Sequence, residues 1–336
     1  MSATAEHARM QVGPAPHVVA RENVTHIMGW VIAALLPATV WAVWNMGMVA
    51  IILLAACIGS SVATEWVWNR IARRPQTLRD GSALVTGLLL ALALPPRTPW
   101  WMGVAGGIVA IALAKMLFGG LGWNLFNPAL VGRAVLTVSW AGVLGEAKPY
   151  PGGWFHALDV PATGGLDAIS GATRLAVASA NRLAAGGYGI DLSAYYQPLL
   201  LRNLEGSLGE VSGLLLLLGG LVLVAKRIID WRIPAAYIAT VAVLSWAFGS
   251  DPLFNVLAGG VLLGAIFMAT DPVTSPMTRA GRLVFGCGCG VFNTVVRFFG
   301  PMPEATTFAI LFMNGLVPFI DRGFSPRTFG WAKRRG

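Results

Sequence analysis

Ten apolar stretches, each about as long as a membrane-crossing helix, constrain this sequence more than any other feature. Such a helix needs about 20 mostly apolar residues, because lipid offers its backbone no hydrogen-bonding partner. Charged residues make up only 12% of the 336-residue chain, well below the roughly 25% of a typical soluble domain. The sequence therefore predicts an all-α polytopic membrane protein. We place its spans at 26–44, 47–68, 81–96, 99–118, 125–144, 211–228, 231–249, 253–271, 281–299 and 305–321.

The distribution of Lys and Arg predicts the orientation of these spans. Basic residues follow the second, sixth, eighth and tenth spans, whereas the loops at 248–253 and 300–304 carry none. Because basic loops stay in the cytoplasm, we expect both termini there and the loop at 145–210 in the periplasm. The predicted location is the bacterial inner membrane. The same loops account for the net charge of +9, so we expect membrane lipids rather than nucleic acid as partners.

Five segments follow from this topology. The first 25 residues are polar, so we expect no signal peptide.

The two halves of the chain resemble each other. Residues 84–91 can be laid over 257–264, and five spans per half would invert the second copy relative to the first. Inverted repeats place binding sites near the membrane midplane, although leucine- and glycine-rich segments also align by chance. The segments are a cytoplasmic arm at 1–24, a five-helix repeat at 25–144, the periplasmic loop at 145–210, a second repeat at 211–322 and a basic tail at 323–336.

Polar side chains in the fifth span form the first candidate site. Arg133 lies near the middle of the span, and Asn124 and Asn127 are three residues apart on one helix face. A buried charge costs about 2.5 to 3.5 kcal/mol on insertion scales, so it requires an explanation. These groups can bind the polar edge of an isoalloxazine ring or stabilise a reduced, anionic flavin. The alternative is a packing network in which Arg133 pairs with a carboxylate or with carbonyl groups.

Other charged residues suggest weaker candidates. Asp271 and Thr274 end the eighth span and are candidates for an ion path or a cofactor contact, although the neighbouring prolines also explain a simple helix stop. Glu65 and Lys115 lie near the cytoplasmic ends of spans two and four, where we expect them to extend to the aqueous interface.

Cysteine and histidine do not predict a resident metal or haem. The Cys287 and Cys289 thiols are an incomplete ligand set for zinc or an iron–sulfur cluster, so we favour a packing role. A cluster shared with another protein of a complex is the alternative. The four histidines lie at span edges or in loops, which argues against an intramembrane haem.

A motif in the long loop gives the most specific indication of function. Residues 167–173 read Asp-Ala-Ile-Ser-Gly-Ala-Thr, a pattern that a flavin transferase recognises when it attaches FMN through its phosphate to the last threonine. Thr173 would then carry the cofactor on the outer side, within reach of a secreted transferase. The alternative is an ordinary loop, because these residues are common turn formers. The expected recognition residues are Asp167, Ser170, Gly171 and Ala172.

Five motifs together resemble the RnfD family, a membrane component of the Rnf ion-translocating electron-transport complex. They resemble, less closely, the related NqrB component of the sodium-pumping NADH:quinone oxidoreductase. The motifs span nearly the whole chain in the family's order. Two departures are Arg174, whose cation can help to hold the FMN phosphate, and Val211, where a hydroxyl residue is frequent. The match at 209–212 adds Glu210 to the candidate cofactor contacts. The motifs lie at 124–133, 167–173, 209–212, 268–273 and 308–314.

The resemblance implies a fold, cofactors and partners. The fold is a urea-transporter-like pair of inverted five-helix repeats with ten transmembrane helices. The cofactors are covalent FMN on Thr173 and noncovalent riboflavin near Asn124 and Asn127. A periplasmic flavin transferase would first attach the FMN. The chain would then relay electrons beside the other Rnf subunits, in a ferredoxin:NAD oxidoreductase that moves Na+ or H+. The rival hypotheses are an inverted-repeat solute or ion channel without a redox role, which leaves the loop motif unexplained, and a structural scaffold.

Overall fold

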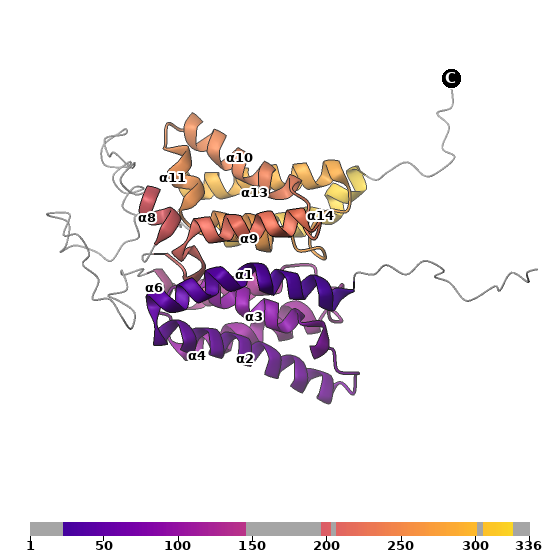
Figure 1. Cartoon of the computed structure of the whole chain (residues 1–336). Helices are drawn as coiled ribbons and strands as arrows, with labels where there is room; N and C mark the ends of the chain where they lie inside the picture. Colours follow the sequence, from indigo (N-terminus) through magenta and orange to yellow (C-terminus); the bar gives the residue numbers. More distant parts are fainter. Residues whose placement is uncertain (1–22, 146–195, 203–205, 301–304, 325–336) are drawn as a thin grey trace, which may run out of the picture.

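The computed structural model describes residues 23–145, 196–202, 206–300 and 305–324, and this part is built from helices (Figure 1). The flavin-attachment motif at 167–173, including Thr173 and the recognition residues, lies outside the described residues, as does Arg174. Three helices, α1, α2 and α13, are long and apolar enough to cross a membrane. Their bounds are Val24–Met46, Met48–Ile71 and Arg279–Phe299.

The first half of the chain continues with shorter helices. The Asn23 side chain begins α1 by accepting a hydrogen bond from the His26 backbone, and Asn127 begins α5 in the same way, with Pro128 in the first turn. Proline is suited to that position because its missing N–H needs no partner there. The remaining elements are the 3₁₀ turn η1 (Leu78–Asp80), α3 (Ser82–Ala93), α4 (Trp100–Ile111), the π-helical turn η2 (Ala112–Met116), α5 (Pro128–Ser139) and α6 (Ala141–Gly145).

The second half contains a break in the range expected for span eight. Ala258 is extended and Gly260 has a φ of 70°, a conformation that glycine adopts without strain. Residues 84–91, by contrast, lie within the continuous helix α3. The elements are α8 (Tyr196–Leu201), η4 (Leu208–Val211), α9 (Gly213–Ala225), α10 (Arg232–Ala247), α11 (Pro252–Leu257), α12 (Val261–Leu263), the π-helical turn η5 (Gly264–Met268) and α14 (Thr306–Gly323).

Helix is present in each of the ten ranges expected from the sequence. In the first half α2 packs against α3 and α4, and α4 packs against α5. In the second half α10 packs against α11 and α13, and α13 packs against α14. Small residues permit this packing: a Cβ at Gly87 would lie 2.6 Å from the Ile58 backbone. Close approach of this kind drives helix association in lipid, where burial of apolar surface does not.

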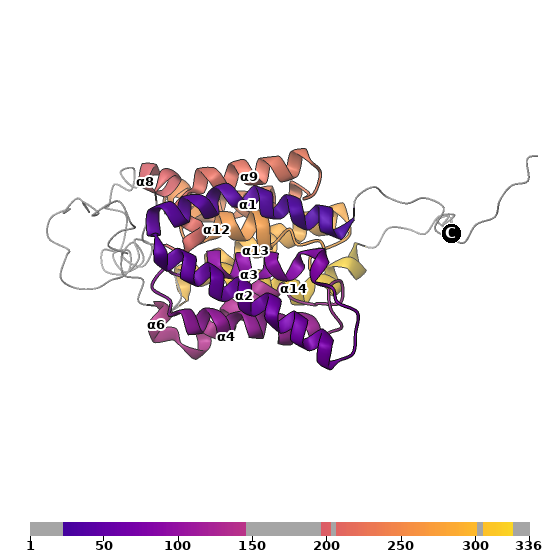
Figure 2. The same cartoon turned by 60° about the horizontal axis from the view of Figure 1, so that its bottom comes forward.

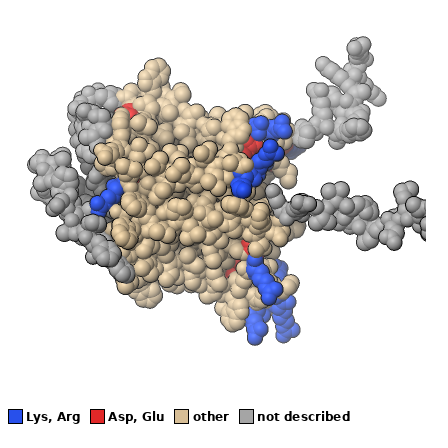
Figure 3. All heavy atoms as spheres, in the orientation of Figure 1, with Lys and Arg blue, Asp and Glu red and all other residues tan. Residues whose placement is uncertain are grey.

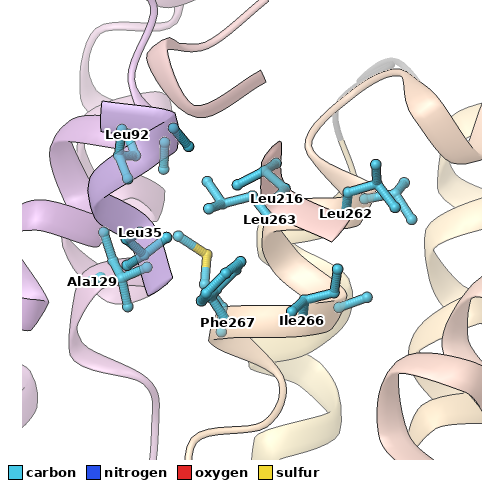
Figure 4. Packing of buried hydrophobic residues seen from close by; sticks show 14 of the residues in the cluster. Leu35, Leu92, Ala129, Leu216, Leu262, Leu263, Ile266 and Phe267 are labelled. Carbon is cyan, nitrogen blue, oxygen red and sulfur yellow. The ribbon is translucent and has the colours of Figure 1, made fainter. Parts of the chain in front are cut away.

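The two halves meet along a shared apolar core. Helix α1 packs against α9, and α5 packs against α14. Figure 4 shows Leu35 and Ala129 of the first half on one side of this core and Leu263 and Phe267 of the second half on the other. All four side chains are buried, so the two halves form one continuous core.

The chain enters and leaves the described bundle at one end. The start of α1 and the end of α14 lie at the same end, whereas α6 and α8 lie at the opposite end (Figures 1 and 2). Most of the Lys and Arg side chains visible in Figure 3 gather at the end where α1 begins. This arrangement agrees with the predicted topology, although the side of the membrane that each end faces stays a prediction.

Candidate functional site

A pocket between the two halves brings together several residues that the sequence singled out. It lies near the end of the bundle where α1 begins, since Ile27 and Met28 line it. The first half contributes walls from α1, α3, η2 and the start of α5, and the second half contributes α9, η5 and the loop that follows η5. We call it the inter-half pocket. Its polar lining residues are Ser82, Thr86, Lys115, Asn124, Asn127, Thr270 and Asp271.

Asn127 is fixed rigidly in the wall of this pocket. Its Oδ1 accepts hydrogen bonds from the backbone of Ala129 at 3.0 Å and of Leu130 at 3.4 Å, which begins α5. Its Nδ2 donates to the Met268 carbonyl oxygen of η5 at 3.1 Å. Asn314 of α14, with its amide oriented to satisfy both ends, accepts from the Asn127 backbone N–H at 3.1 Å. The Asn127 amide therefore joins the two halves beside the pocket.

Asn124, in the same wall, contains a buried hydrogen-bond acceptor without a partner. Its Nδ2 donates to the Phe126 carbonyl oxygen at 3.3 Å, but its buried Oδ1 has no hydrogen-bond partner. A buried polar atom without a partner costs about 1 to 3 kcal/mol, so this oxygen requires a donor from a water or from a ligand. An isoalloxazine ring carries an N–H between two carbonyl groups, and a ribityl chain carries hydroxyl donors. The hydrogen-bonding chemistry of Asn124 therefore suits the donors of the expected flavin.

Asp271 also lines the pocket, in the loop that follows η5. Its Oδ2 accepts from the Thr274 hydroxyl at 3.2 Å, and its Oδ1 accepts from the Val273 backbone at 3.3 Å. Thr274 is buried but is not among the lining residues. The structure thus places Asp271 close to the asparagine pair, and Thr274 supports its carboxylate from behind.

Lys115 and Glu65 correct an expectation from the sequence. Neither extends to the aqueous interface, because their side chains are only 2% and 0% exposed. Instead the Lys115 Nζ lies 2.6 Å from Glu65 Oε2 and donates at 2.6 Å to the hydroxyl of Ser82. The two residues are 50 positions apart on η2 and α2, so sequence spacing gave no sign of their contact. Sequence reasoning also missed that Lys115, Ser82 and Thr86 line the pocket.

Arg133 and Glu210 lie away from the pocket, at the break between α11 and α12. A Cβ at Gly260 would lie 3.4 Å from Glu210 Oε1 and 4.0 Å from an Arg133 guanidinium nitrogen. Glu210 also accepts from the Gly259 backbone at 3.1 Å and from the Ser207 hydroxyl at 2.7 Å. Glu210 therefore satisfies the Gly259 backbone N–H at the break, with Arg133 close by. The cofactor contacts expected for Arg133 and Glu210 stay a prediction.

Arg297 of α13 supports the same break from the other side. Its guanidinium donates to the Asn255 carbonyl oxygen at 2.6 Å and to the Ala258 carbonyl oxygen at 3.1 Å. Both carbonyl groups lie at the carboxyl-terminal end of α11, where no backbone N–H of a following helical turn is available to them. The sequence revealed a charge inside the ninth span but gave no indication of which backbone it serves.

A metal site does not emerge from the part of the chain that the structure describes. No group of three or more His, Cys, Asp or Glu side chains is arranged there to hold an ion. A packing role was expected for both thiols of α13: Cys289 is buried, which is compatible with it, whereas Cys287 is exposed and is not enclosed by the described residues.

Comparison with known proteins gives a consistent result over nearly the whole chain. The model of the NQR2, RnfD, RnfE family matches residues 11–330. A relative from Acetobacterium woodii, named as part of a Na+-translocating ferredoxin:NAD+ oxidoreductase complex, is 41% identical over 324 residues, covering 96% of each chain. A relative from Clostridium ljungdahlii, named as part of a proton-translocating ferredoxin:NAD+ oxidoreductase complex, is 40% identical over 331 residues, covering 95% of this chain and 96% of the relative. A relative from Stutzerimonas stutzeri, named as part of an ion-translocating oxidoreductase complex, is 44% identical over 329 residues, covering 92% and 93%.

Proposed function

The chain belongs to the NQR2, RnfD, RnfE family, and from that membership we propose that it is a flavin-carrying membrane component of an ion-translocating ferredoxin:NAD oxidoreductase complex. In this role it relays electrons between other subunits while the complex moves a cation across the bacterial inner membrane. Two relatives of nearly equal identity are named for different ions, Na+ and the proton. The transported ion of this chain therefore requires its own measurement.

The inter-half pocket is the proposed site for a noncovalent flavin, riboflavin. The observation that carries this assignment is the buried, unpartnered Oδ1 of Asn124, which needs a donor such as a flavin N–H or a ribityl hydroxyl. A flavin bound there supplies one- and two-electron transfer chemistry. The fixed Asn127 amide and the apolar side chains of the pocket, among them Leu89 and Phe267, orient the ligand and exclude water.

Thr173 is the proposed attachment point of a second flavin, FMN, through a phosphoester. The support is the motif at 167–173 together with membership of the family. Asp167, Ser170, Gly171 and Ala172 would be read by a periplasmic flavin transferase, and Arg174 would neutralise part of the phosphate charge. A covalent tether is physically reasonable on the outer side, because it keeps the cofactor at a high local concentration.

The proposed topology has ten spans in two inverted, urea-transporter-like repeats, with both termini cytoplasmic. It is supported by the matching helix pairings of the two halves, with α2 against α4 on one side and α10 against α13 on the other. It is also supported by the common end at which α1 starts and α14 finishes (Figure 1). The loop at 145–210 would then reach the periplasm, where the transferase acts.

A simple experiment separates this function from the rival channel without a redox role. The protein is produced with the transferase, denatured and examined for flavin fluorescence in the gel. We expect a fluorescent band for the native chain and for Thr163→Ala, a control in the same loop, and a dark band for Thr173→Ala. A dark band for the native chain, combined with solute flux in liposomes, would favour the channel.

Loss of the pocket flavin is measured separately, as flavin released into the supernatant on denaturation. Fluorescence that stays in the gel reports the covalent cofactor, and fluorescence in the supernatant reports the noncovalent one. A native complex that releases none would contradict the assignment of the inter-half pocket.

A further inference from the structure

We propose that Lys115 and Glu65 form a buried charge pair that sets the reduction potential of the flavin in the inter-half pocket. This inference rests on the proposed function, because it assumes that the pocket holds a noncovalent flavin. It goes further by assigning a tuning role to two residues that were expected only to reach the membrane surface.

The pair is expensive to bury, and stability alone does not explain it. Both side chains are almost fully enclosed, at 2% and 0% exposure. Removing two charges from water costs several kcal/mol per ion in proteins, and apolar replacements of a buried pair are often as stable or more stable. Ionisable residues inside a membrane are therefore functional candidates by default. The nearest functional feature is the pocket, because Lys115 itself lines it.

The local backbone directs Lys115 to this position. Lys115 lies on η2, a π-helical turn at the end of α4, and such turns are frequent at functional sites. The Lys115 Nζ donates to the Ser82 hydroxyl, and Ser82 also lines the pocket. A second π-helical turn, η5, contributes Phe267 to the opposite wall and the carbonyl oxygen that holds Asn127. Both π-helical turns of the described chain thus border the same pocket.

Other polar groups hold the two charges in place. Glu65 Oε1 accepts a hydrogen bond from the Thr77 hydroxyl, and Thr77 accepts one from Asn69 at 3.0 Å. The Ser82 hydroxyl, which accepts from Lys115, donates to the Asp80 carboxylate. Glu65 and Lys115 therefore each have a hydrogen-bond partner besides each other, which favours the orientation of both charges.

The electrostatic consequence has a definite sign for each residue. A flavin gains negative charge on reduction, and a nearby ammonium group stabilises that form, whereas a carboxylate destabilises it. Charges interact strongly inside a protein because the effective dielectric constant is well below that of water. Lys115 should therefore raise the reduction potential of the pocket flavin, and Glu65 should offset part of that effect.

The test is a spectroelectrochemical titration of the noncovalent flavin in the purified complex. Lys115→Met, which retains the length of the stem but not the charge, should shift the potential to more negative values. Glu65→Gln, which removes the carboxylate in direct contact with the ammonium group, should shift it to more positive values. The double variant should return toward the native value, because both charges are absent. A lysine that does not line the pocket, Lys226 beside Trp30, provides the control: Lys226→Met should leave the potential unchanged.

Opposite shifts cannot arise from a general loosening of the fold, which would move both single variants in the same direction. Unchanged potentials in both single variants, with the flavin still bound, would overturn the inference. If Lys115→Met does not assemble, Glu65→Gln decides the question alone, because a shift to more negative values or no shift contradicts the proposal. A native complex that releases no noncovalent flavin would instead refute the proposed function of the pocket, so the two failures are distinguishable.

Discussion

Asn127 donates a hydrogen bond from its Nδ2 to the carbonyl oxygen of Met268, a residue 141 positions away, at 3.1 Å. The same side chain accepts from the backbone that begins α5. One amide therefore starts a helix of the first half and fastens it to η5 of the second half. Because both contacts lie in the wall of the inter-half pocket, they couple the shape of the pocket to the packing of the halves.

Replacement of Asn127 by Ala should destabilise the protein. The variant loses a helix cap, worth about 1 kcal/mol, and a hydrogen bond between the halves, worth about 0.5 to 1.5 kcal/mol. We expect a combined loss of roughly 1 to 3 kcal/mol, seen as a lower thermal midpoint in detergent. Asn45→Ala is the control, since the Asn45 side chain donates within its own helix, to the Trp41 carbonyl oxygen at 2.8 Å. Equal losses for the two variants would contradict the bridging role.

Asn124→Leu should separate binding from stability. The buried Oδ1 of Asn124 has no protein partner, so an apolar replacement removes an unsatisfied group and does not break a strong contact. We expect the flavin-free variant to unfold at the native temperature or slightly above it, while the noncovalent flavin released from the complex falls at least tenfold. Native flavin content in this variant would show that Oδ1 does not bind the ligand.

Two glycines should respond in opposite directions to the same substitution. A Cβ at Gly87 would lie 2.6 Å from the Ile58 Cα and 2.8 Å from the Cys57 carbonyl oxygen, whereas a Cβ at Gly59 would meet nothing within 4 Å. Gly87→Ala should therefore cost about 1 to 3 kcal/mol through overpacking. Gly59→Ala should gain up to about 1 kcal/mol from helix propensity. Thermal unfolding of both variants measures the difference, and a stable Gly87→Ala protein would refute the close packing of α2 and α3.

Asp230 should give the loop between α9 and α10 a measurable pH dependence. Burial raises the pKa of Asp230, but hydrogen bonds from the Arg232 backbone and from the Arg282 and Arg232 guanidinium groups outweigh burial and leave the pKa below 3.8. A carboxylate with a lowered pKa stabilises the fold above its unfolded pKa, about 3.9. This stabilisation is lost as the pH falls through the lower, folded pKa.

The measurement compares native protein with Asp230→Asn. We expect the variant to be less stable by about 0.2 to 1 kcal/mol at pH 7, and the difference should shrink as the pH falls below the unfolded pKa and disappear below the lowered, folded pKa. High salt should also reduce the difference, because the Arg282 contact at 2.7 Å is partly exposed. A difference that grows on acidification would contradict the sign of the shift.

The sequence predicted the helices well, because the apolar stretches needed for a membrane are visible locally. It did not predict the break at Ala258–Gly260 in the eighth range or the division of the fifth range into α5 and α6. Backbone breaks of this kind persist only because distant groups satisfy them, as Arg297 does for the Ala258 carbonyl oxygen. A linear pattern contains no information about such partners.

The sequence predicted only part of the site, because contacts between distant helices leave no pattern in the linear sequence. The sequence placed Asn124 and Asn127 on one helix face, which is wrong, because α5 begins at Pro128 and both residues precede it, Asn127 as its N-cap. Their joint presence in the pocket follows from their closeness in the chain. The approach of Asp271 to this pair and the contact between Lys115 and Glu65 depend on how helices far apart in the chain pack together. Two charges near the ends of spans two and four gave the impression of interfacial residues, because each was considered without its partner.

The central claim is that this chain carries flavin, and intact-mass analysis of the protein tests it most directly. Protein from cells that produce the flavin transferase should be heavier than the bare polypeptide by one FMN less one water, with the added mass on the peptide that contains Thr173. The Thr163→Ala variant should retain this increment, and Thr173→Ala should lose it. The account would be contradicted if the protein had only the mass of the unmodified chain. The cells must be shown to contain active transferase, by its modification of another substrate.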